Sequence, residues 1–326
     1  MKKIKLIFLS FLVLIINFSQ VKSEEKFDYW VTEFKIRAIN EGISEKTVNL
    51  VMNNAIFLPK VIEYDRYQPE FYEDTKTYVS KRTSKDRVKK GKKLYKNNRK
   101  LINYVDQEFN IEKELLLALM GIETNYGTYL GKMDIISSLA TLSYDKRRSD
   151  YFSGELITLL KLIDKDIVKL NDLKGSWAGA HGNFQFMPSS INNYALDYDQ
   201  NGKIDLYTSL EDSFASAANY LNKIGWDNNP WGTKVSLSKK LKKNNFTFDA
   251  RKLSKLRTVD TWKKMGVVLP ENFKVNSKSK ARLVKPDGEV SDVYLVLNNY
   301  DKILNWNRSL RFAITVGLFA DYLSDV

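Results

Sequence analysis

Apolar residues recur at helical spacing through most of the first 225 positions of this 326-residue chain. Such spacing puts one side of a helix against a core. The clearest stripe runs along Val88, Gly91, Leu94, Tyr95, Asn98, Leu101, Ile102 and Val105. Similar patterns cover residues 111–123, 150–170 and 211–224, and residues 24–110 have helical character throughout. The pattern therefore predicts a mainly helical protein.

The pattern changes after Gly225, a residue typical of a helix end. Apolar and β-branched runs at residues 281–284 and 293–297 flank the turn-forming residues 286–288, which indicates strands. A last helical pattern spans Ser309–Leu323. We therefore expect an α+β chain with four parts after the leader: an N-terminal helical lobe (24–100), a helical core (101–225), a small strand-containing lobe (226–300) and a closing segment packed on the core (301–326).

The first residues have the features of a secretory signal peptide. Three lysines precede an apolar run from Leu6 to Phe18, and the small-residue pattern that follows predicts cleavage after Ser23. The alternative is a membrane anchor, but the run is shorter than the roughly 20 residues that span a bilayer. We expect residues 1–23 to be removed, no membrane span in the remainder, and a periplasmic protein.

The chain contains no cysteine. This excludes disulfides, thiol nucleophiles and zinc sites built on thiolates, so an exported protein of this kind relies on its core for stability. It also removes the cysteine that would carry a lipid on a mature N-terminus.

Positive charge is concentrated in one stretch. The formal net charge is +13, and residues 81–100 contain eleven Lys or Arg and a single acid, Asp86. Nucleic acid is the usual partner of such a stretch. Export argues against it, and an anionic cell wall or membrane face fits better. A solvated helix face without any partner is the alternative.

The catalytic groups available to this chain are few. There is one histidine, His181, and no Gly-x-Ser-x-Gly motif, so a Ser-His-Asp triad is not supported and a zinc site built on histidines is excluded. His181 lies in a glycine-rich loop, where packing is its ordinary role. Phosphate-binding loops of the Walker type are also absent from the sequence. Carboxylates remain.

Glu123 is the most unusual carboxylate. On a helix it continues the line of Leu116, Leu119 and Met120. A carboxyl group on an apolar stripe is partly desolvated, which raises its pKa and keeps it protonated near neutral pH, as a general acid requires. The alternative is a structural Glu that caps or bridges a helix end, and periodicity alone does not separate the two.

Seven blocks of sequence resemble the membrane-bound lytic murein transglycosylase B family. The first, Gly121–Gly127, contains the Glu-Thr-x-x-Gly signature of lysozyme-like transglycosylases. The others, in the same order as in the family, are Ser138–Leu142, Tyr151–Leu156, Leu173–Ala180, Gln185–Ser190, Ala218–Leu221 and Trp306–Ser309. The resemblance covers roughly residues 60–325 and implies a lysozyme-like catalytic core with flanking lobes around a deep groove.

The resemblance also implies roles for individual residues. Glu123 would be the single acid and base, with Ser176 and Gln185 binding the sugar and positioning its acetamido group. Three further residues would line the cleft: Tyr220, Asn307 and, on weaker grounds, Tyr78. Two positions depart from the family, which usually has Met at His181 and often Tyr at Phe312. Phe312 would keep a stacking face for substrate but lacks the hydroxyl.

The implied reaction cleaves the MurNAc–GlcNAc bond without water and gives 1,6-anhydromuramoyl products. One carboxylate suffices when the substrate's 2-acetamido group acts as nucleophile, so Glu155 and Asp134 are expected to be structural. The rival hypotheses are a hydrolytic muramidase and a non-catalytic wall-binding protein of the same fold. The implied partners are peptidoglycan strands and other cell-wall enzymes; no organic cofactor is implied.

Residues 197–205 resemble the first half of an EF-hand loop. Side-chain oxygens of Asp197, Asp199 and Asn201, together with the backbone carbonyl of Lys203, would bind a calcium ion. The usual closing Glu is replaced by Thr208, so the closing carboxylate would come from Glu211 or Asp212. Some members of the family bind calcium in such a stretched loop. The alternative is an Asx-Gly turn without an ion.

Overall fold

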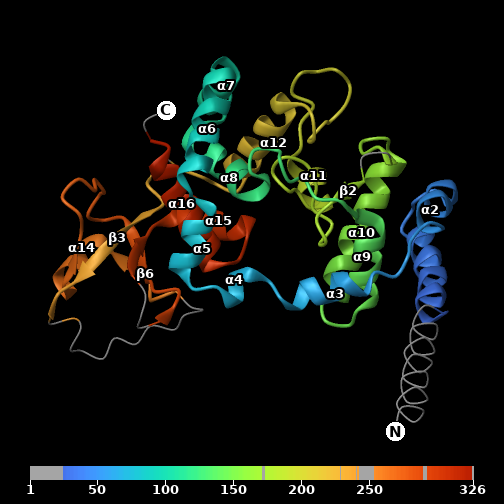
Figure 1. Cartoon of the computed structure of the whole chain (residues 1–326), viewed down its shortest axis with the longest axis horizontal. Helices are drawn as coiled ribbons and strands as arrows, with labels where there is room; N and C mark the ends of the chain where they lie inside the picture. Colours follow the sequence, from blue (N-terminus) through green and yellow to red (C-terminus); the bar gives the residue numbers. More distant parts are fainter. Residues whose placement is uncertain are drawn as a thin grey trace, which may run out of the picture. The chain divides into compact units, whose positions relative to one another are not determined.

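The computed structural model describes residues 25–170, 173–227, 229–239, 241, 253–288 and 292–324. Helices dominate and a small antiparallel sheet occupies part of the C-terminal third (Figure 1), which confirms the expected mainly helical fold. The predicted signal peptide lies outside the described residues. Within them, no helix is both long enough and apolar enough to cross a bilayer.

The chain divides into two compact units, and both are discontinuous in sequence. The first contains Met1–Arg66, Leu130–His181 and Gln185–Asn192, and the second contains Tyr67–Tyr129, Gly182–Phe184 and Asn193–Val326. The lobe boundaries expected near residues 100, 225 and 300 stay predictions.

The first unit is a helical bundle. Residues 25–40 form a helix, followed by α2 (Glu45–Met52), α3 (Pro59–Arg66), α9 (Ile135–Tyr144) and α10 (Ser149–Asp164). Helix α11 (Pro188–Tyr194) belongs to this unit up to Asn192, and its last two residues belong to the second unit. Helix α9 packs along α10, while α3 and α2 cover them. Their apolar faces form one core that includes Phe27, Leu139 and Leu156. A two-stranded ribbon, β1 (Met133–Asp134) with β2 (Lys174–Gly175), precedes the glycine-rich loop.

The second unit is built around α8 (Lys113–Thr124), in which every residue from Leu115 to Gly121 is buried. A helix that is apolar on all sides must be covered on all sides. The covering helices are α6 (Lys85–Asn97), α7 (Arg99–Phe109), α12 (Leu210–Lys223) and α16 (Leu310–Tyr322). Helices α4 (Pro69–Tyr72), α5 (Thr75–Arg82) and α15 (Asn298–Trp306) complete the helical part, with α5 and α15 packed on α16.

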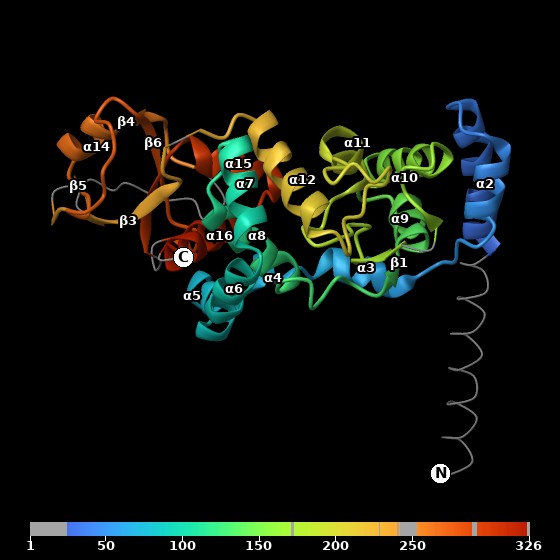
Figure 2. The ribbon, with the colours of Figure 1, turned by 90° about the horizontal axis from the view of Figure 1, so that it is seen from above.

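The sheet of the second unit has five antiparallel strands in the order β4-β6-β7-β3-β5. They are β3 (Gly232–Leu237), β4 (Arg257–Thr258), β5 (Val267–Val268), β6 (Lys280–Val284) and β7 (Val293–Val296). Helix α14 (Val259–Met265) adds the fully buried Trp262 to the core of this sheet, where its indole donates to the carbonyl of Ala281 at 2.9 Å. Figure 2 shows α14 beside this sheet in the C-terminal part of the chain. Strands β6 and β7 match the two strand patterns found in the sequence.

Several predicted elements needed correction. The helix expected over residues 150–170 ends at Asp164, because Asp166 adopts a positive φ of 59° that a right-handed helix does not accept. The stripe from Val88 to Val105 is divided between α6 and α7 at Asn98, whose φ of −125° interrupts the helix. Helices α9 and α15 and the β1–β2 ribbon were not expected as separate elements.

Candidate active site

Glu123 lies in the last turn of α8, and the end of that helix is held tightly. Asn125, Tyr126 and Gly127 follow with φ values of 49°, 59° and 76°, so three consecutive residues adopt the left-handed conformation that stops the helix. The buried hydroxyl of Thr124 donates to the carbonyl of Asn183 at 2.8 Å and accepts from the Gly127 amide at 3.0 Å. The Glu-Thr-x-x-Gly motif thus fixes the turn that carries the carboxyl group.

Glu123 is half-buried, and its carboxyl group accepts a hydrogen bond. The indole Nε1 of Trp306, the last residue of α15, donates to Glu123 Oε1 at 3.0 Å. Helix α8 itself has no basic residue in its last turn; the guanidinium of Arg87 donates to the Gly121 carbonyl there at 2.6 Å. An indole can donate but not accept, so it orients the carboxyl group without competing for its proton.

Aromatic rings pack against Trp306, the donor of this hydrogen bond. The Trp306 ring makes edge contacts with Tyr220, at a centroid distance of 4.8 Å, and with Phe184, at 6.3 Å. Tyr220 makes a similar contact with Tyr194 at 4.5 Å, and its hydroxyl donates to the carbonyl of Asn305 at 3.1 Å. The structure therefore places Tyr220, a predicted cleft residue, against the Trp306 ring that donates to Glu123.

Asn307 directly follows Trp306 and fixes the chain there. Its side-chain oxygen accepts from the Ser309 amide at 3.0 Å, and its own amide donates to the carbonyl of Ile303 at 3.0 Å. The first of these bonds stabilises the short connection between α15 and α16. A direct contact of Asn307 with substrate stays a prediction.

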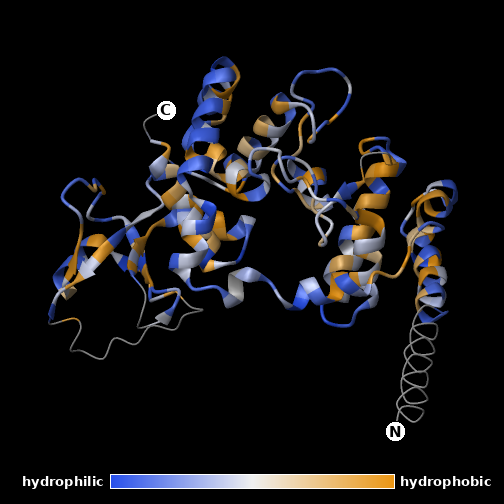
Figure 3. Cartoon of the chain, viewed as in Figure 1, coloured by the Kyte–Doolittle hydropathy of each residue, from blue (hydrophilic) through white to orange (hydrophobic). Residues whose placement is uncertain are grey.

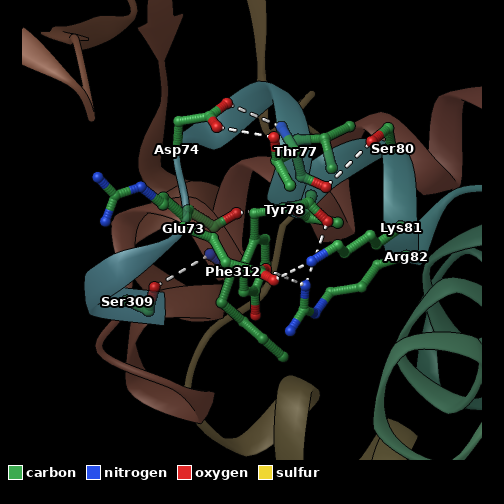
Figure 4. Close-up of polar contacts among 12 residues, drawn as sticks. Glu73, Asp74, Thr77, Tyr78, Ser80, Lys81, Arg82, Ser309 and Phe312 are labelled. Carbon is green, nitrogen blue, oxygen red and sulfur yellow. Dashed lines mark hydrogen bonds and ion pairs between the residues drawn. The ribbon is translucent and has the colours of Figure 1, made fainter. Parts of the chain in front are cut away.

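Tyr78 and Phe312 lie where α5 packs against α16 (Figure 4), and both are buried, at 1% and 2% exposure. The guanidinium of Arg82 lies 3.5 Å from the centre of the Tyr78 ring and pairs with Glu73 at 3.0 Å. Ser309 accepts from the Phe312 amide at 3.2 Å at the start of α16. Burial leaves little of either ring for a sugar, so their role in substrate binding also stays a prediction.

Ser176 and Gln185 belong to the first unit, whereas Glu123, Tyr220 and Asn307 belong to the second. Ser176 closes a tight turn, because its hydroxyl accepts from the amides of Ala178 at 3.3 Å and Ala180 at 3.1 Å. Gln185 has a positive φ of 52°, and its side-chain amide donates to the carbonyl of Leu130 at 3.3 Å. Both side chains remain partly accessible.

Glycines shape the loop that carries Ser176. A Cβ on Gly131 would lie 2.0 Å from the carbonyl oxygen of Gly175, so the two chain segments approach each other as only glycine allows. His181 follows in the same loop and pairs through its backbone with Phe186. Burial lowers the pKa of His181 to about 4, which keeps the imidazole neutral near pH 7. This agrees with a packing role for the one histidine.

Asp134 and Glu155 have the structural roles expected for them. Asp134 caps α9 by accepting from the Ser137 amide at 2.7 Å. The buried Glu155 accepts from the amide of Ser189 at 2.9 Å and from its hydroxyl at 2.7 Å, in the first turn of α11. Each carboxylate satisfies backbone donors at a helix start.

Residues 197–212, named the acidic loop, bring three carboxylates together. One oxygen from each of Asp197, Asp199 and Asp212 lies within 4.8 Å of the other two. Asp212 is buried, which raises its pKa, although it accepts from the amides of Tyr198 at 2.7 Å and Asp205 at 2.8 Å. Glu211 is exposed, so Asp212 is the carboxylate that faces the loop. Three clustered anionic oxygens are the donors that a hard divalent cation prefers.

The backbone amides of Asn201 and Lys203 donate to side chains within the acidic loop. The Asn201 amide donates to Asp197 at 3.0 Å, and the Asn201 side-chain oxygen accepts from the Lys203 amide at 3.0 Å. Gln200 and Gly202 both have positive φ values, of 57° and 85°. These hydrogen bonds and turn conformations fold the loop around the carboxylates, and a bound ion there stays a prediction.

Sequence reasoning did not assign a role to Trp306 or Arg87. Trp306 stands in one of the family blocks, but its contact with Glu123 joins positions 183 apart in the chain. Arg87 was counted only as part of the basic stretch, yet its guanidinium is half-buried and donates to the carbonyl of Gly121 at 2.6 Å.

The chain is similar to known proteins over most of its length. The family model described as "Transglycosylase SLT domain" matches residues 26–321. The chain belongs to this family. Membrane-bound lytic murein transglycosylase B of Escherichia coli K12 is 38% identical to the chain over 150 residues. That alignment spans 46% of this chain and 41% of the relative, so less than half of the curated relative is matched.

Solved structures of other transglycosylase SLT relatives match over most of the chain. SltB3 of Pseudomonas aeruginosa, in complex with NAG-anhNAM-pentapeptide, has a TM-score of 0.80 and 34% identity over 91% of this chain and 79% of its own. The lytic transglycosylase Slt35 of Escherichia coli, in complex with calcium, has a TM-score of 0.75 and 28% identity over 90% of this chain and 92% of its own.

Proposed function

We propose that the protein is a peptidoglycan lytic transglycosylase that cleaves the β-1,4 bond between MurNAc and GlcNAc without water, with Glu123 as the single acid and base. Membership of the transglycosylase SLT family supports the reaction class. The observation that carries the assignment of the catalyst is the hydrogen bond from Trp306 to Glu123, at the rigid end of a buried helix.

The first step breaks the glycosidic bond. Protonated Glu123 donates its proton to the glycosidic oxygen, and the bond from that oxygen to muramic C1 breaks. The oxygen of the substrate's own 2-acetamido group attacks C1 and forms a cyclic oxazolinium, so no second protein carboxylate is required. Ser176 and Gln185 are proposed to hold the acetamido group in the geometry for attack.

The second step closes the product. The Glu123 carboxylate accepts the proton of the muramic 6-hydroxyl as that oxygen attacks C1 and displaces the acetamido oxygen. Glu123 is protonated again, and the product carries a 1,6-anhydro ring. The 6-hydroxyl is tethered to the reacting carbon and therefore has a large effective concentration compared with water. Rings such as Tyr220 and Trp306 are proposed to limit the access of water to the intermediate.

The rival hypothesis is a muramidase that passes the intermediate to water. SltB3 has been captured with a NAG-anhNAM-pentapeptide, whose muramic unit is in the anhydro form, and this supports the non-hydrolytic reaction for a relative that is 34% identical. A wall-binding protein without activity is less well supported, because its fold would not require a positioned carboxyl group at Glu123.

Mass spectrometry of muropeptides released from purified sacculi tests the proposal. Transglycosylation should give products that are lighter than muramidase products by one water and that have no reducing end on muramic acid. Products with a reducing end would establish hydrolysis instead. Intact sacculi after incubation with the purified protein would favour the wall-binding hypothesis.

We also propose that the acidic loop binds calcium through Asp197, Asp199, Asn201 and Asp212, with the carbonyl of Lys203 as a further ligand. The three clustered carboxylates fit this ion, and a calcium complex of the relative Slt35 supports it. A bound ion would neutralise the mutual repulsion of the carboxylates and stabilise the loop. Its proposed role is structural, in a protein that we place in the periplasm after export.

A further inference from the structure

The structure divides the basic stretch of residues 81–100 into two groups. Some cations are used within the second unit: Arg87 donates to the carbonyl of Gly121, and Lys81 and Arg82 pair with Glu73 at 2.5 and 3.0 Å. A second group is exposed and is defined here as the α6 lysine face; its members are Lys85, Lys89, Lys90, Lys93 and Lys96. Within the described part of the chain, no acidic side chain lies within 4.0 Å of the ammonium groups of these five lysines.

Four of the five lysines of the α6 lysine face form a ridge. Positions 85, 89, 93 and 96 follow at helical spacings of four, four and three residues and therefore share one side of α6. With a rise of about 1.5 Å per residue, the backbone positions of neighbouring lysines are about 5–6 Å apart along a helix about 20 Å long. One acid, Asp86, stands in the first turn of the helix. Like charges gathered on one side of a helix repel one another and attract counter-ions or an anionic partner.

The opposite side of α6 is committed to packing. Tyr95 is buried and its hydroxyl donates to Asn103 at 2.9 Å. Gly91 is required there, because a Cβ would lie 2.3 Å from the hydroxyl oxygen of Tyr126. No large apolar side chain of α6, all of whose residues are described, is exposed, and hydrophilic residues predominate along the helix (Figure 3). The helix cannot roll over to insert an apolar face into a bilayer.

We propose that the α6 lysine face binds the surface of a membrane that contains anionic phospholipids, and that it does so by electrostatic attraction without insertion. Lipid headgroups diffuse laterally, so their phosphates can gather under closely spaced ammonium groups. Carboxylates of a wall polymer are bonded to its chains and cannot diffuse independently in this way. The preference for lipid over nucleic acid rests on the proposed export, whereas the catalytic assignment is not used.

The test measures co-sedimentation of the purified protein with vesicles of phosphatidylcholine, with and without phosphatidylglycerol. We expect binding only to the anionic vesicles, and release when salt is raised from about 0.1 M to about 1 M. The variant Lys89→Gln/Lys93→Gln/Lys96→Gln should bind about a hundredfold more weakly, at about fivefold per lysine. Glutamine and lysine have similar helix propensities, so α6 should be retained.

The matched control removes the same charge from exposed lysines of the strand-containing region, Lys263→Gln/Lys274→Gln/Lys278→Gln, and should bind vesicles nearly as well as wild type. Equal loss in both triple variants, or no binding of wild type to anionic vesicles, would overturn the proposal. If only pull-down by sacculi is weakened in the α6 variant, the partner is a wall polymer and the membrane proposal is wrong. Muropeptide release is a separate measurement, so failure of the catalytic assignment would not be confused with failure of this inference.

Discussion

At the scale of single residues, the chemistry depends on one carboxyl group and one indole. Glu123 stands at the end of α8, and Trp306 at the end of α15 donates to it at 3.0 Å. The same helix has a matched pair at its other end, where the indole of Trp226 donates to Glu112 at 2.7 Å. The two pairs have the same chemistry but only one belongs to the proposed site, which makes Glu112 and Trp226 suitable controls.

We predict that Glu123→Gln loses at least about 10²–10⁴-fold in turnover, because an amide cannot transfer the proton. The amide oxygen can still accept from Trp306, so folding should be preserved. Release of muropeptides from sacculi measures the effect, with circular dichroism as the check on folding. Glu112→Gln should remain active. Digestion by Glu123→Gln at a rate near wild type would remove Glu123 from the mechanism.

Trp306→Phe should lower kcat about ten- to hundredfold with little change in KM, because a hydrogen bond to a charged group contributes about 1.5–3 kcal/mol. Replacement of Trp306 by benzothienylalanine, which keeps the ring shape but has sulfur in place of N–H, should reproduce the loss. Trp226→Phe should not. Steady-state kinetics on a soluble glycan fragment distinguish the outcomes: a rise in KM alone would make Trp306 a wall of the cleft rather than a positioning residue.

At the scale of elements, the loop of residues 197–212 is the part whose stability should depend on a ligand. Calcium should stabilise the protein by about 2.7 kcal/mol at a hundredfold excess over Kd. Thermal unfolding with millimolar calcium and with chelator measures this. Asp199→Asn should reduce the shift, because Asp199 is exposed and its loss removes a ligand rather than core packing. Identical melting temperatures of wild type in the two conditions would support the plain turn.

At the scale of the whole molecule, the single histidine should give stability a measurable dependence on pH. The pKa of His181 is lowered by burial from 6.5 to about 4 in the folded protein. Between these values the unfolded chain binds a proton that the folded chain does not, so stability falls as pH decreases through this window. The full difference corresponds to roughly 3 kcal/mol.

His181→Met cannot bind that proton, so its free energy of unfolding should fall less steeply between about pH 6.5 and 4. Urea denaturation of both proteins across this range measures the slopes. Because the chain has no second histidine, no other imidazole can supply the difference. Parallel curves for the two proteins would contradict a neutral, buried His181, whereas a constant offset would report only a change in packing.

Local patterns in the sequence determined those helices, strands and turns that depend only on neighbouring residues. The apolar run before Glu123 could only be a buried helix, and β6 and β7 follow from two β-branched runs around a Pro-Asp-Gly turn. Pro188 begins α11, where its missing N–H costs nothing. Contacts along the chain and the covalent geometry of proline and glycine act within a few residues, so their effect can be read from a short window.

Tertiary structure decided what depends on distant partners. Only packing brings Trp306 to Glu123, because the pattern of residues in one helix does not say which residue of another helix it will meet. The choice of Asp212 over Glu211 is a choice between two faces of α12, one buried against the loop and one exposed. Tyr78 and Phe312, which the family resemblance predicts to line the cleft, are buried by the packing of α5 on α16, and their own sequence positions do not show this. Burial and orientation depend on what lies across the core, and that information is not present in any local stretch of sequence.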